Sequence, residues 1–281
     1  MNTLELQKTL REKGIYTTPA DKSYPLLDRL FGRTDTWYYL KIFRVISSGA
    51  VIARCGKYDT SVWGDQSCAI LRAAEACGAT ITISGCENVT KLNKAAVYVS
   101  NHMSMLETMF YPGILLSFGG LATVVKESLL TYPVFGNIMR AVDPISVSRK
   151  SPREDLKEVL TKGETILRAG RSVLIFPQST RRLEFNAGEF NSLGVKLARK
   201  AGVPIIPIAL KTDFHSIGRR FKDIGSLDRT KHVYFKFGPS LEIAGNGREE
   251  HEKITEFIES NLRAWGAPVE ENSKSAGKDD K

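Results

Sequence analysis

The sequence predicts an α/β fold with a central mixed, largely parallel sheet flanked by helices. Short β-rich runs alternate with helical stretches over residues 79–265, and several of these runs are apolar throughout. Alternating strands and helices are typical of parallel sheets, and strands without a polar face are covered on both sides. The hydrophobic fraction of 42% and charged fraction of 25% are ordinary for a globular fold of this kind.

The predicted strands are runs rich in β-branched and aromatic residues. They lie at residues 79–84, 95–100, 121–125, 143–147, 172–176, 203–210 and 232–237. The clearest helix is 152–169, where Ser151 and Glu154 have the spacing of a capping box. A second helix is expected over about 61–77.

Three regions follow from these patterns. Residues 1–78 form an N-terminal helical region, residues 79–265 form the α/β domain, and residues 266–281 form a tail. The tail contains a single Val as its only large aliphatic residue, so we expect it to be disordered.

Residues 37–54 differ from the rest of the N-terminal region. Three aromatic residues open this segment, and basic residues are spaced among apolar ones after them. One interpretation is an interfacial helix that docks on an anionic membrane surface. The other is an ordinary amphipathic helix packed on the core, and the sequence leaves both open.

Composition narrows the class of protein. The formal net charge is +9, which suits nucleic acid, an anionic membrane or phosphorylated substrates. No recognisable nucleic-acid module appears, so no nucleic-acid partner is expected. No apolar run of about 18 residues and no secretory signal appears. We therefore expect a peripheral or monotopic protein on the cytoplasmic face of a membrane.

The motifs of cofactor and metal sites are missing from the sequence. The four Cys form no C-x-x-C pair, and neither a phosphate-binding loop nor a dinucleotide fingerprint occurs. No G-x-S-x-G elbow occurs either, which argues against an acyl-enzyme on an α/β-hydrolase template. We expect no metal and no cofactor.

His102 is the sharpest candidate for chemistry. It follows the predicted strand 95–100, at the end of a strand where α/β proteins place their sites. If His102 lies in the turn and Glu107 in the first helical turn, the carboxylate can hold one imidazole nitrogen and leave the other free to take a proton. The alternative is structural, because Ser104 and Glu107 also have capping-box spacing.

A second polar cluster, residues 176–182, follows another predicted strand. Its adjacent arginines, Arg181 and Arg182, suit bidentate contact with phosphate, although a basic solvated turn would have the same composition. The remaining histidines are expected at the surface. They are His215, His232 and His251.

Taken in order, these clusters resemble the glycerolipid acyltransferases of the lysophosphatidic acid acyltransferase type. The first block of that family, N-H-x-S-x-x-D, appears as NHMSMLE, and the third, F-P-E-G-T-R-S, appears as FPQSTRR. The second block ends at an arginine, and the fourth is a Pro-containing apolar strand. The four blocks lie at residues 101–107, 126–149, 176–182 and 203–207.

The resemblance implies transfer of a fatty acyl group from acyl-CoA or acyl carrier protein to a hydroxyl of a glycerolipid acceptor such as lysophosphatidic acid. It implies that His102 is the general base and that Glu107 orients it. By their match to the second and third blocks, further residues would bind substrate. These are Arg149, Gln178, Ser179, Thr180 and Arg181.

Three positions depart from the family pattern. Glu107 stands in place of Asp and keeps the carboxylate with a longer reach, while Gln178 and Ser179 replace a Glu and a Gly in the third block. These two changes motivate two alternatives: a different lysolipid acceptor, or an inactive relative that binds lipid or acyl carrier protein.

Overall fold

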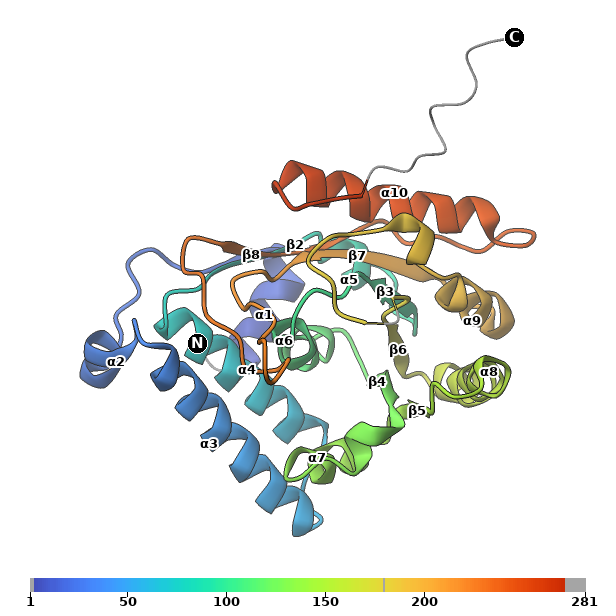
Figure 1. The fold of residues 1–281 in the computed structure, drawn as a ribbon. Helices are drawn as coiled ribbons and strands as arrows, with labels where there is room; N and C mark the ends of the chain where they lie inside the picture. The colour runs from blue at the N-terminus through green and yellow to red at the C-terminus, as the bar shows by residue number, and fades with distance from the viewer. Residues whose placement is uncertain (1–2, 179, 271–281) are drawn as a thin grey trace.

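One eight-stranded sheet organises the molecule, for which a computed structural model describes residues 3–178 and 180–270 (Figure 1). The strand order is β1-β2-β8-β7-β3-β6-β4-β5. The pairs β1–β2 and β7–β8 are antiparallel, and the remaining neighbours are parallel. The predicted mixed, largely parallel sheet is confirmed. Its strands are β1 (Tyr16–Thr17), β2 (Thr80–Ser84), β3 (Val97–Ser100), β4 (Leu121–Lys126), β5 (Ile145–Val147), β6 (Ser172–Ile175), β7 (Ile205–Lys211) and β8 (His232–Phe237).

Helices lie on both sides of this sheet (Figure 1). α8, α9 and α10 pack against the strands on one side, whereas α1, α4 and α6 pack together on the other, with α3 outside α4. The helices are α1 (Thr3–Lys13), α2 (Leu26–Phe31), α3 (Asp35–Arg54), α4 (Thr60–Ala76), α5 (Glu87–Thr90), α6 (Leu106–Leu115), α7 (Phe135–Ala141), α8 (Pro152–Arg168), α9 (Leu193–Ala201) and α10 (Arg248–Ala264), with 3₁₀ turns η1 (Glu127–Leu130) and η2 (Ala187–Glu189).

All seven predicted strands are present, and the helices expected over 61–77 and 152–169 are α4 and α8. The capping box of α8 is not formed, because the Ser151 side chain accepts no bond from the helix. Asp155 caps the preceding turn instead: its carboxylate accepts the backbone N–H of Ser148 at 2.8 Å and that of Arg149 at 2.7 Å.

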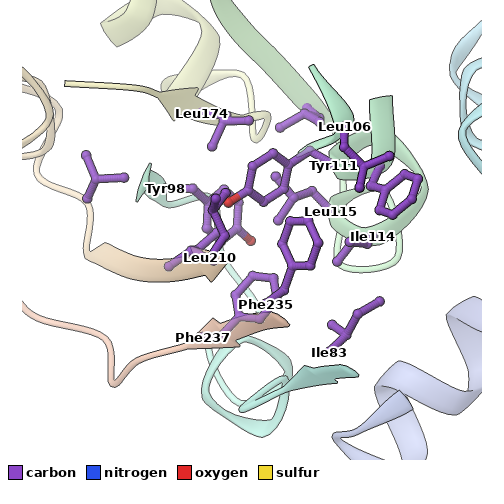
Figure 2. Close-up of a cluster of buried hydrophobic side chains, with 14 of the residues drawn as sticks. Ile83, Tyr98, Leu106, Tyr111, Ile114, Leu115, Leu174, Leu210, Phe235 and Phe237 are labelled. Carbon is purple, nitrogen blue, oxygen red and sulfur yellow. The ribbon is translucent and has the colours of Figure 1, made fainter. Parts of the chain in front are cut away.

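The core between the sheet and α6 combines aromatic and aliphatic side chains (Figure 2). β3 alternates in the way a strand covered on both faces must: the Tyr98 ring faces this core, while Val99 lies against Gly194 at the start of α9. The Tyr111 ring of α6 meets Phe235 of β8 edge to face, with 5.4 Å between ring centroids. α6 is therefore held firmly over β3 and β8.

The N-terminal region and the α/β domain share this core. Buried Leu6, Tyr38 and Trp63 belong to the same apolar cluster as the sheet residues, and β1 pairs with β2. The predicted tail differs from the structure over 266–270, where Phe185 exchanges backbone hydrogen bonds with the chain at Pro268 and Glu270. The rest of that prediction concerns residues 271–281, which lie outside the described part.

The segment 37–54 lies within α3, which is amphipathic. Tyr38 and Ile42 are buried, whereas Leu40, Phe43 and Val51 are exposed. The helix therefore packs on the core with one face and presents an apolar face outward. Within the described residues, no helix combines the length and the apolar character needed to cross a bilayer.

Gly85 provides a test of this architecture. Its φ is +76°, and an added Cβ would lie 2.2 Å from the Phe237 carbonyl oxygen, whereas Gly170, at φ +82°, has nothing within 4 Å of that position. Both Gly→Ala variants force a left-handed conformation, which costs about 1–2 kcal/mol. Only Gly85→Ala also displaces a strand carbonyl, so we expect it to lower the free energy of unfolding by roughly 3 kcal/mol or more in urea titrations. Equal losses in the two variants would contradict this packing.

Candidate active site

The candidate site lies where three neighbouring parallel strands end. β7, β3 and β6 are adjacent in the sheet, so the turn after β3, the loop after β6 and the residues that end β7 meet at one edge. Asn101 extends the β3–β7 pairing beyond the strand, since its side-chain amide both donates to the Leu210 carbonyl at 2.8 Å and accepts from the Leu210 N–H at 2.9 Å. This clip holds the start of the turn that carries His102.

His102 and Glu107 meet within that turn. His102 Nδ1 lies 2.8 Å from Glu107 Oε1, and the side chains are 15% and 0% exposed. The predicted contact between imidazole and carboxylate is therefore present. Because the carboxylate accepts the proton on Nδ1, the neutral imidazole has Nε2 as its proton acceptor.

The Glu107 carboxylate is fully buried and saturated with donors. Besides His102, its Oε1 accepts the backbone N–H groups of Met103 and Ser104, each at 2.7 Å. Its Oε2 accepts the hydroxyls of Ser104 at 2.8 Å and Thr212 at 2.7 Å. Burial by itself raises the pKa of this carboxyl, but the hydrogen bonds and the charge of His102 outweigh burial, so the pKa is lowered and Glu107 is ionised.

The two interpretations of Glu107 turn out to be compatible. Its Oε1 reaches back to the Ser104 N–H, as in a capping box, while the Ser104 hydroxyl accepts the Leu106 N–H at 3.0 Å. The same oxygen also holds His102. One carboxylate therefore begins α6 and orients the imidazole, so the structural role does not compete with the chemical one.

The loop after β6 completes the surroundings of His102. The Phe176 ring stacks on the imidazole, with 4.3 Å between centroids. The Gln178 Oε1 accepts the His102 backbone N–H at 2.8 Å, and the Arg182 N–H donates to the His102 carbonyl at 2.9 Å. The backbone of His102 is thus held from both sides by the segment that the sequence identifies as a substrate loop.

The predicted binding residues are placed at different distances from this centre. Gln178 is buried against His102, Thr180 is exposed on the same loop, and Ser179 lies outside the described residues. Arg149 follows β5, which β6 and β4 separate from β3; three strand spacings amount to about 14 Å. The structure therefore brings Gln178 to His102 and places Arg149 at the edge strand of the sheet.

Arg181 precedes Arg182, whose N–H binds the His102 carbonyl, and the Arg181 side chain is already paired. Its Nη2 donates to Asp223 Oδ1 at 2.6 Å. Its Nη1 is buried without a hydrogen-bond partner among the described residues.

His215 corrects a prediction, because it is fully buried rather than at the surface. Its Nε2 lies 2.9 Å from the Tyr39 hydroxyl of α3, and burial lowers the pKa of its imidazole. Thr212, which the sequence analysis missed, binds Glu107 from the end of β7. The only sequence signal for either residue is that both follow a long apolar strand at the edge where the other two loops meet.

No site for a metal ion emerges from the side chains. Within residues 3–178 and 180–270, no three His, Cys, Asp or Glu residues gather closely enough to hold one. The polar groups at the edge are those of a candidate general-base site, in which a buried carboxylate orients an imidazole. The fold and these groups place the chain in the class of α/β proteins that carry such a candidate site.

The comparisons with known proteins specify that class further. Residues 80–211 match the family described as Acyltransferase, in agreement with the resemblance that the motifs carry. It is 33% identical over 170 residues to a 1-acyl-sn-glycerol-3-phosphate acyltransferase of Pseudomonas aeruginosa, covering 60% of this chain and 62% of that protein. It is 33% identical over 131 residues to the chloroplastic 1-acyl-sn-glycerol-3-phosphate acyltransferase LPAT1 of Arabidopsis thaliana, covering 46% and 35%.

The fold has a solved counterpart. The crystal structure of the 1-acyl-sn-glycerophosphate (LPA) acyltransferase PlsC from Thermotoga maritima aligns with a TM-score of 0.60 and 19% identity. The alignment covers 84% of this chain and 96% of that one, which supports the fold. The chain spans less than two thirds of the length of the Pseudomonas and Arabidopsis relatives.

The buried carboxylate leads to a prediction about stability. Glu107→Gln removes the charge and one acceptor oxygen, and we expect a loss of about 1–3 kcal/mol in the free energy of unfolding at pH 7. Because the pKa of Glu107 is lowered on folding, the charged carboxylate stabilises the protein above the ordinary carboxyl range. This advantage should diminish as the pH falls below about 4.

Urea unfolding of both proteins at several pH values checks this expectation. Glu242→Gln, at an exposed pair with Lys94, is the control and should change little at any pH. If the difference in free energy of unfolding between wild type and Glu107→Gln stays constant with pH, the role assigned to the charge is wrong.

Proposed function

We propose that this protein transfers a fatty acyl group from acyl-CoA or acyl carrier protein to a hydroxyl of a lysophosphatidic acid-type acceptor. The observation that carries the proposal is the 2.8 Å bond between His102 Nδ1 and the buried carboxylate of Glu107, at the edge where the blocks at 101–107 and 176–182 meet. The names of the Pseudomonas and Arabidopsis relatives support the same reaction.

The proposed chemistry needs no acyl-enzyme. His102 Nε2 takes the proton of the acceptor hydroxyl as its oxygen attacks the thioester carbonyl carbon. A C–O bond forms, the C–S bond breaks, and the leaving sulfur takes the proton back from the imidazolium to become a thiol. Ionised Glu107 stabilises the imidazolium while it exists and prevents the ring from turning. No cofactor or metal is needed for these steps.

Acceptor binding falls to the loop after β6. Arg181 offers a guanidinium to the acceptor phosphate, and Ser179 and Thr180 are proposed to contribute polar contacts beside it. Gln178 has a positioning role, since its side-chain oxygen holds the backbone of His102. Arg149, at the edge strand, would meet a part of the substrate remote from the reacting hydroxyl.

The contact between Gln178 and His102 argues against the alternative that this chain is an inactive relative. The His102 N–H needs an acceptor oxygen, and an amide supplies one as well as a carboxylate does. The change from Glu to Gln therefore leaves the support of the base intact, which favours an active enzyme. A lysolipid acceptor other than lysophosphatidic acid remains the second candidate, motivated by the altered residues 178 and 179.

We propose that the membrane supplies the acceptor and that α3 docks there peripherally, on the cytoplasmic face. Phe43 is 64% exposed and Leu40 and Val51 are exposed on the same helix, with Leu26 and Leu30 exposed on neighbouring α2. Large exposed apolar side chains on successive helices are suited to the headgroup boundary, and the net charge of +9 favours anionic lipid.

The proposed base has a direct test. His102→Ala should lower kcat for acyl transfer by about 10²–10⁴-fold, the usual contribution of a general base. Spectrophotometric release of the thiol from acyl-CoA, with lysophosphatidic acid as acceptor, measures the rate. His251→Ala, on α10 at the opposite side of the sheet, is the matched control and should retain wild-type turnover. Turnover by His102→Ala close to wild type would overturn the mechanism.

Membrane docking has a separate test. We expect Leu40→Ser with Phe43→Ser to weaken binding to vesicles of anionic phospholipid at least tenfold, because burial of each large apolar side chain contributes about 1.5–3 kcal/mol. Sedimentation with vesicles measures the partition. Leu4→Ser, an exposed apolar position on α1, serves as the control. Partition that is equal in the double variant and the control would exclude α3 as the docking face.

A further inference from the structure

The segment 212–231, which links β7 to β8, supplies an unexpected partner to Arg181. Asp223 on this segment accepts from Arg181 Nη2 at 2.6 Å, and the two side chains are 42% and 22% exposed. The segment lies outside the region that matches the acyltransferase family, residues 80–211. The pair therefore joins a family motif residue to a part of the chain that the motif does not include.

The position of Asp223 is fixed by the base of its loop. The Ser216 N–H donates to the Ser226 carbonyl at 3.0 Å, which closes the loop. An added Cβ at Gly225 would lie 1.8 Å from the Ser216 carbonyl oxygen, so the two sides of the loop are in direct contact there. Asp223 is held two residues from this closure.

α3 anchors the same loop from outside. The Tyr39 hydroxyl donates to the Gly225 carbonyl and lies 2.9 Å from His215 Nε2. The carboxylate of Asp35 accepts the Leu227 N–H at 3.2 Å and Arg229 Nη1 at 2.9 Å. The loop is thus attached to a helix of the N-terminal region at its two ends, and Asp223 cannot move far from Arg181 without breaking these contacts.

Among the described residues, Asp223 bonds the guanidinium at Nη2, whereas Nη1 is buried and without a hydrogen-bond partner. A buried donor without a partner is unfavourable, so the guanidinium keeps hydrogen-bonding capacity that Asp223 does not use. The Arg181 side chain is 22% exposed, and a ligand oxygen that binds its exposed part does not need to displace Asp223.

We propose that Asp223 is a positioning residue that fixes Arg181 so that the guanidinium receives a phosphate oxygen of the acceptor. The inference rests on the proposed function and deepens it by naming the group that sets acceptor affinity. If Asp223 instead competed with the phosphate for the guanidinium, removal of the Asp223 charge would strengthen acceptor binding.

The test separates KM from kcat. Asp223→Asn should raise KM for lysophosphatidic acid about tenfold with kcat within about twofold of wild type, because a charge-assisted hydrogen bond is lost. Asp223→Glu keeps the carboxylate and should recover most of the affinity. With a monoacylglycerol, which lacks phosphate, KM should be the same in wild type and Asp223→Asn. Asp228→Asn, whose side chain contacts Thr230 on the same link, should match wild type.

Binding without turnover distinguishes failure of this inference from failure of the proposed function. Calorimetric titration of the full chain with glycerol 3-phosphate should show about tenfold weaker binding in Asp223→Asn and in Arg181→Ala, and unchanged binding in His251→Ala. This result would support positioning even in a chain that transfers no acyl group. Tighter or unchanged binding by Asp223→Asn, or an equal rise in KM for both acceptors, would overturn it.

Discussion

Burial of the Glu107 carboxylate is the constraint on which the rest of the site depends. An ionised carboxylate in a core is unfavourable unless donors surround it. The donors here come from two parts of the chain: His102 and Ser104 in the turn after β3, and Thr212 at the end of β7. Satisfying one charge therefore requires that β3, α6 and β7 be in register, so the geometry of the imidazole follows from the stability of the fold.

Local sequence patterns predicted the strands, the turn and the loop of this site, but not the tertiary contacts around them. The β-rich runs, the turn at His102 and the basic loop at 176–182 carry periodic or turn signals that depend on few neighbours, and all are present where expected. The burial of His215 and the contact of Asp223 depend on β8 inserting between β2 and β7, a pairing between segments far apart in the chain. The neighbouring residues in the sequence give no signal of that pairing, and the sequence around His215 and Asp223 is typical of a surface loop.

Glu107 has two roles that its spacing in the sequence cannot tell apart. Ser104 and Glu107 have the spacing of a helix start and also follow His102 at the distance a dyad requires. From spacing alone these are two uses of one carboxylate. In the structure its two oxygens accept five hydrogen bonds, so both uses are satisfied at once. A residue's capacity for hydrogen bonds is not visible in a motif, although the chemistry of the side chain allows it.

The two regions that the sequence divides at residue 78 are in direct contact in the structure. α3 belongs to the N-terminal region by sequence, yet Tyr39 and Asp35 hold the loop that carries Asp223, and Asp223 holds Arg181. The exposed apolar face of α3 and the guanidinium beside His102 are thus connected by a short series of direct contacts. If α3 rests on a bilayer, the depth of this helix sets the height of Arg181 above the lipid. Under the proposed function, the N-terminal region then does more than attach the protein, because it places Arg181 at the level of the acceptor's phosphate group.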